Sequence, residues 1–166
     1  LFLFGFVFLF LPQRLTIFPA LWILVYISAG ALKLNAEWIS GAALANVPPW
    51  GDNFLIELQI FVIFIELVLS WLLLSRTKVF FWIAVFHLVC FHAASYFIVG
   101  FLYPAVCFVI LGFCVWCARE KFPLPRPRGL AAWVFLSLFV LAQVRLHVAS
   151  EDGALTGVGR LGALNM

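Results

Sequence analysis

Apolar residues occupy most of the chain in runs of helix-spanning length, and short polar segments separate these runs. A membrane-spanning helix needs roughly 20 predominantly apolar residues. Backbone groups in lipid must be satisfied within the segment, which favours helices. The pattern therefore predicts an all-α fold, a multi-pass transmembrane helical bundle of about six helices with the first one truncated.

The predicted helices cover residues 1–12, 15–34, 54–75, 79–99, 101–118 and 130–149. Residues 1–149 form one transmembrane helical domain in this interpretation, and residues 150–166 form a polar extracytoplasmic tail. Because the chain opens at Leu1 inside an apolar run, we expect the beginning of the first helix, and helices before it, to be missing.

Composition supports a lipid environment. Hydrophobic residues make up 66% of the chain and charged residues 10%, whereas soluble domains have about 45–50% apolar and about 25% charged residues. The net charge of +3 belongs to loop residues and predicts no nucleic-acid patch. We expect the lipid bilayer and other membrane subunits, or a second copy in a homo-oligomer, as partners.

The basic loop residues predict an orientation. If the helices alternate in direction, seven cations fall on one side: Arg14, Arg76, Lys78, Arg119, Lys121, Arg126 and Arg128. The other side holds Glu37, Asp52, Glu151 and Asp152, with Arg160 as its loop cation. Basic loops mark the cytoplasmic side of membrane proteins. This rule predicts that the Lys33 end and the C-terminal tail are periplasmic or lumenal.

Ionisable residues within spans are costly, and each is by default a functional hypothesis with a partner. Lys33 lies near the outer end of the second predicted helix, and Glu57 lies at similar depth in the third. Glu66 lies deeper in the third helix, and its nine-residue separation from Glu57 puts the two on nearly opposite faces. We keep both acids as candidate partners of Lys33. The alternative is that Lys33 extends to the lipid headgroups as an interfacial anchor.

Three further residues complete a candidate polar cavity near the outer face: His87, Arg145 and His147. His87 and His92 are five residues apart, so they do not share a helix face and make a poor metal pair. The CxxC spacing of Cys114 and Cys117 occurs within an apolar helix and indicates two small core residues. The sequence predicts no metal site.

Several segments resemble, in order, a known membrane domain. The strongest is Ala29-Gly30-x-x-Lys33-Leu34, followed by Trp38 and Gly41. The other matching segments, in chain order, are Glu66-Leu67 before Leu72–Arg76, Phe86-His87-Leu88, Phe97-x-x-Gly100, Gln143–His147, and Leu155-Thr156-x-x-Gly159 with Met166. This order resembles the horizontally transferred transmembrane (HTTM) domain of vitamin K-dependent gamma-glutamyl carboxylases and their bacterial relatives. The tryptophan expected before Thr156 is Leu155 here, and the family's later serine and tryptophan are Ala163 and Leu164.

The resemblance implies a quinone as cofactor, in the form of reduced vitamin K or a similar compound. In the carboxylases a lysine of this motif is the proposed base that deprotonates the reduced quinone, whose reaction with oxygen gives an alkoxide that removes a proton from glutamate. Lys33 matches that lysine. Glu57 or Glu66 would tune it, and Trp38, His87, Arg145 and His147 would belong to the binding site. Burial disfavours the charged ammonium, which suits a lysine base.

Two functions follow from these observations. The first is a membrane enzyme with quinone-linked chemistry and Lys33 as base. The second is a non-catalytic accessory or scaffold subunit of a larger respiratory or photosynthetic membrane complex, in which the aromatic helices pack against protein or pigment.

Overall fold

The computed structural model describes residues 10–11, 14–40, 55–99 and 102–149, and over these residues it is helical with short connections. The helices run, in chain order, α2 (Arg14–Leu32), α3 (Ala36–Ile39), α4 (Leu55–Leu67), the 3₁₀-helix η2 (Leu69–Leu74), α5 (Lys78–Val99), α6 (Leu102–Glu120) and α7 (Leu130–Ala149). This arrangement confirms the predicted all-α bundle. The first predicted helix falls almost wholly outside the described residues, as does the predicted tail.

Three described segments are long and apolar enough to cross a membrane: Leu15–Leu32, Leu55–Leu74 and Lys78–Phe97. Only 28% of the second window and 33% of the third are buried inside the bundle, and both carry many exposed apolar side chains. Large exposed side chains such as Phe64, Phe86 and Trp71 would be a liability in water and fit contact with lipid tails. The chain is an integral membrane protein.

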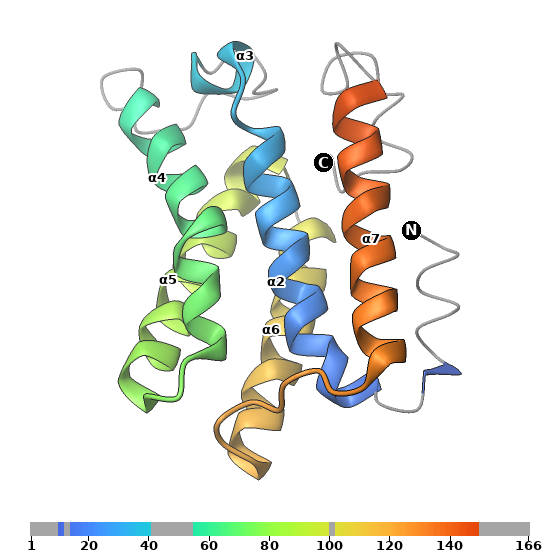
Figure 1. The fold of residues 1–166 in the computed structure, drawn as a ribbon. Coiled ribbons are helices and arrows are strands. Elements are labelled where there is room, and N and C mark those ends of the chain that lie inside the picture. The colour runs from blue at the N-terminus through green and yellow to red at the C-terminus, as the bar shows by residue number, and fades with distance from the viewer. Residues whose placement is uncertain (1–9, 12–13, 41–54, 100–101, 150–166) are drawn as a thin grey trace.

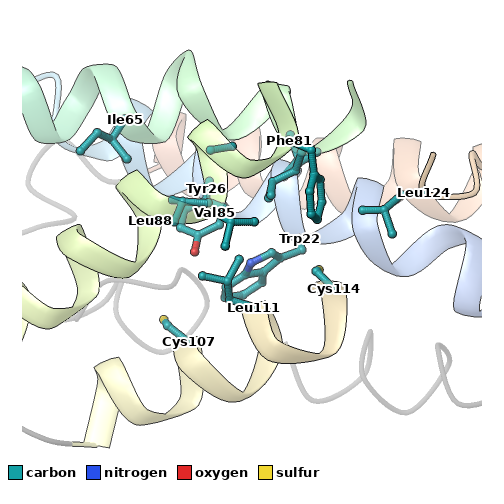
Figure 2. Close-up of a cluster of buried hydrophobic side chains, with 13 residues drawn as sticks. Trp22, Tyr26, Ile65, Phe81, Val85, Leu88, Cys107, Leu111, Cys114 and Leu124 are labelled. Atoms are coloured by element: carbon teal, nitrogen blue, oxygen red, sulfur yellow. The ribbon is translucent and has the colours of Figure 1, made fainter. Parts of the chain in front are cut away.

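Helix α2 is the central element of the bundle. It packs against α4 and η2 on one side and against α7 on the other, as Figure 1 shows. The main core cluster joins α2 to α4, η2, α5 and α6 through buried side chains that include Trp22, Tyr26, Ile65, Phe81 and Leu111 (Figure 2). A second cluster joins Ile17 of α2 to Phe135 and Leu136 of α7, together with Ala132.

The helices alternate in direction. The beginnings of α2, α5 and α7 and the end of α6 lie at one end of the bundle, the lower end in Figure 1. The end of α2, α3 and the beginning of α4 lie at the opposite end (Figure 1). The basic residues of the turn before α5 and of the loop after α6 therefore gather at one end of the molecule, which we call the basic end.

The third predicted helix is not one continuous α-helix. Its α-helical part ends at Leu67, and η2 continues it with tighter turns. The hydroxyl of Ser70 donates to the carbonyl of Glu66 over 2.7 Å, and such back-bonding by serine bends helices. The α-helix therefore ends at Leu67, one residue after Glu66, the acidic residue of the site described next.

Candidate functional site

Lys33 and Glu66 form an ion pair between the end of α2 and the end of α4. The Lys33 amine lies 2.7 Å from one carboxylate oxygen of Glu66 and 2.6 Å from the other. The Glu66 side chain is fully buried, and the Lys33 side chain is 18% exposed. A carboxylate buried in an apolar bundle needs a charged or hydrogen-bonding partner. Lys33 supplies it and retains a small opening to the surroundings.

A glycine on α2 allows the two helices to approach closely enough for this pair. A Cβ atom added to Gly30 would lie 2.9 Å from Cγ of Leu67 and 3.0 Å from Cβ of Glu66. Small residues let membrane helices pack backbone against backbone. Gly30 thus lets the side chains of Glu66 and Leu67 lie directly against α2, and Lys33, about one turn further along, reaches the carboxylate.

Asn35 fixes the chain directly after Lys33. Its side-chain amide donates to the carbonyl of Leu32 over 2.6 Å, and its side-chain oxygen accepts from the backbone amide of Trp38 over 2.8 Å. One side chain therefore closes the end of α2 and caps the start of α3, as asparagine commonly does at helix N-termini. Residues 35–53 were predicted to be a connection, and the role of Asn35 was missed, although an asparagine before a short helical segment is a recognisable capping signal.

Trp38 lies beside the ion pair. The Lys33 amine sits 5.1 Å from the centre of the Trp38 ring, within the range of a cation–π contact. The indole nitrogen of Trp38 is buried and has no hydrogen-bond acceptor among the residues that the structure describes. Lys33, Glu66 and Trp38, all of them sequence-predicted site residues, are thus brought together.

Glu57, the other candidate partner of Lys33, is not part of this site. Its side chain is exposed in the first turn of α4, where the helix dipole stabilises a carboxylate. It forms no ion pair within the described part of the chain. Of the two candidate partners, Glu66 forms the pair, because the close approach at Gly30 brings the end of α4, and not its beginning, to Lys33. The predicted opposition of the two acidic residues on the helix is confirmed.

A second buried polar pair links α2 to α5. The hydroxyl of Tyr26 and Nε2 of His92 share a hydrogen bond of 2.7 Å, and both side chains are almost completely buried. The rings of Phe91 and Phe108 pack against His92, with centroids 4.8 and 6.1 Å away. His92 was not among the predicted site residues, because its partner lies 66 residues away in the sequence, on a helix whose rotation no local pattern reveals.

The remaining predicted site residues do not join Lys33 through any described contact. Nδ1 of His87 donates to the carbonyl of Ile83 over 2.8 Å, within α5 itself. Arg145 and His147 lie in the last turns of α7, and their side chains are outside the described part of the structure. In the described residues, no three histidine, cysteine or acidic side chains are grouped as for a metal ion.

Comparisons of the chain with protein-family models, with curated proteins and with solved structures give no match. The integral membrane fold and the Lys33–Glu66–Trp38 site therefore rest on the sequence and the structure.

Proposed function

We propose that the protein carries out quinone-linked chemistry in the membrane, with Lys33 as the base that removes a proton from a hydroxyl of a reduced quinone. The resemblance of residues 29–41 to the carboxylase motif motivates the choice of quinone. The observation that carries the proposal is the bidentate ion pair of Lys33 with the fully buried Glu66.

The residues around the pair fit such a ligand. The buried indole N–H of Trp38 has no acceptor within the described residues, and a buried donor without a partner is costly. An oxygen of a bound quinone would satisfy it. Lys33 is the member of the pair with exposed surface, so the hydroxyl to be deprotonated would approach Lys33 and not Glu66.

The ion pair provides a place for the proton. Proton transfer from Lys33 to Glu66, across the 2.6 Å that separates their atoms, leaves a neutral amine and a carboxylic acid. A low-dielectric interior penalises separated charges. The free-energy difference between this neutral form and the ion pair is therefore reduced. The neutral amine can accept a proton from a bound acidic hydroxyl. The pair then holds one additional proton, with an ammonium on Lys33 and a carboxylic acid on Glu66.

The test is oxygen consumption by the full chain in lipid nanodiscs, started with a reduced naphthoquinone. A general base contributes about 10²- to 10⁴-fold to rate, so Lys33→Met and Glu66→Gln should each reduce the rate by at least about 100-fold. Glu57→Gln is the matched control, because it removes a carboxylate from the same helix outside the site, and it should retain the wild-type rate. Trp38→Phe keeps the ring without the N–H and should raise KM more than it lowers kcat.

The second candidate is the accessory or scaffold subunit, and the same ion pair gives it a specific basis. The Lys33–Glu66 ion pair holds α2 and α4 together, and this structural role requires no catalytic activity. If Lys33→Met folds and consumes oxygen at the wild-type rate, the base assignment is wrong and the pair is structural. Co-purification with membrane subunits in fixed stoichiometry would then support the accessory role.

A further inference from the structure

A groove of about 400 Å³ lies between α5 and α6 at the basic end of the bundle, lined by Lys78, Phe81, Trp82, Val115, Ala118, Arg119 and Phe122. On α5 the lining residues follow the spacing i, i+3, i+4, which puts them on one face of that helix. Val115, Ala118 and Arg119 follow the same spacing on α6, and Phe122 lies just after the end of that helix. The groove is thus built from the beginning of α5, the end of α6 and the start of the loop after it.

The groove combines an aromatic wall with two cations. Phe81 is almost completely buried and meets Phe122 edge to face, with ring centroids 5.7 Å apart. Trp82 packs against Phe81 at 5.5 Å and remains 51% exposed. A half-exposed tryptophan beside basic residues is typical of the interface between hydrocarbon and headgroups.

Neither cation of the groove has a carboxylate partner among the described residues. Lys78 and Arg119 are exposed, and neither forms an ion pair with a carboxylate in the part of the chain that the structure describes. Glu120, the acidic residue next to Arg119 in the sequence, is exposed and forms no such pair either. Lys78 also opens α5, whose N-terminal dipole adds positive potential. The groove therefore presents an uncompensated positive charge above an apolar wall.

We propose that this groove binds the phosphate headgroup of an anionic phospholipid from the leaflet at the basic end, with Lys78 and Arg119 on the phosphate. Arginine binds phosphate through its planar fork, and lysine binds it as a point charge. Basic pockets between membrane helices on the cytoplasmic side are suited to anionic headgroups. The acyl chains would follow the exposed face of Trp82 and the apolar flank of α6. The groove lies where α5 begins and α6 ends, at the opposite end of the bundle from the end of α2 (Figure 1), which Lys33 follows directly in the sequence. It therefore does not depend on the proposed chemistry.

The experiment is native mass spectrometry of the full chain from micelles that contain equal amounts of phosphatidylglycerol and phosphatidylcholine. The wild type should retain one phosphatidylglycerol in preference to phosphatidylcholine. Loss of one charge-assisted contact with the phosphate reduces the preference by at least about fivefold, so Lys78→Gln with Arg119→Gln should reduce it by at least about 25-fold. Exchange of the two charges, Lys78→Arg with Arg119→Lys, should retain most of it.

The matched control is Arg126→Gln with Arg128→Gln, which removes two exposed charges from the loop after α6, outside the groove. It should leave the preference within about twofold of the wild type. An equal loss in the control would mean diffuse attraction to the basic end and would overturn the site. Displacement of the lipid by an equimolar amount of glycerol 1-phosphate would also overturn it, because a soluble phosphate would then be the ligand.

Discussion

Replacement of Lys33 by methionine removes the only charged partner that the described structure gives to Glu66. Because the Glu66 side chain is fully buried, its carboxylate must then protonate, move or remain unpaired. Loss of one partner of a buried ion pair costs about 3–5 kcal/mol. We expect Lys33→Met to lower the free energy of unfolding by about 3 kcal/mol, since protonation of the carboxylate relieves part of the penalty.

The reverse change should cost less. Glu66→Gln leaves the Lys33 ammonium without its partner, but this side chain is 18% exposed at the end of α2 and can extend toward the headgroups. We expect this variant to lower the free energy of unfolding by about 1–2 kcal/mol. In the double variant neither charge remains, so the loss should be no larger than that of Lys33→Met alone. The coupling free energy between the two residues is then at least about 1–2 kcal/mol.

The assay follows unfolding in mixed micelles through the reactivity of buried thiols. Cys107 and Cys114 are each 1% exposed, so a thiol-reactive dye labels them only when the bundle opens. Cys90 and Cys117 are more accessible and would be replaced by alanine in all four proteins of the cycle. Free energies that add within about 0.5 kcal/mol would show two independent residues and would refute the ion pair as a stabilising contact.

Three further predictions concern single positions. Gly30→Ala should destabilise the bundle by about 1–3 kcal/mol in the same thiol assay, because the new methyl group overlaps the facing leucine of α4. Gly112→Ala should be neutral or slightly stabilising, because a Cβ atom added there has no atom within 4 Å. Equal losses in the two variants would contradict the close approach of α2 and α4. Tyr26→Phe should lower the free energy of unfolding by about 1–3 kcal/mol, because it removes the hydroxyl that is hydrogen-bonded to the buried histidine on α5. Tyr96→Phe, at an exposed position, should leave the thermal unfolding temperature unchanged. Glu57→Gln should leave both the unfolding free energy and the quinol-dependent oxygen rate unchanged, and a loss of either would mean that the exposed acidic residue has a role outside the ion pair.

The order and length of the helices could be predicted from the sequence because apolar runs of membrane length are a strong local signal. Lys33 could be singled out because an ionisable residue within an apolar run is costly and needs a partner. The break after Leu67 could not be predicted, because it depends on one serine hydroxyl and the carbonyl of Glu66 within an otherwise uninterrupted apolar run.

The identity of the partner of Lys33 depended on packing that no single helix reveals. Depth along straight, parallel helices favours Glu57, whereas the contact at Gly30 brings α4 against α2 at Glu66. The same reason hides the pairing of His92 with Tyr26. Helix crossing and rotation are set by side-chain interlocking between neighbours, and one-dimensional periodicity gives no information on them.

The central claim is that Lys33 and Glu66 together take up the proton of a bound reduced quinone. Infrared difference spectroscopy of the protein in nanodiscs, with and without a reduced naphthoquinone, measures this directly through the carbonyl stretch of a protonated carboxylic acid. The account predicts that this band rises when the reduced quinone is added and is missing in Glu66→Gln, while Glu57→Gln retains it. A carboxylate signal from Glu66 that stays unchanged when the ligand binds and reacts would contradict the account.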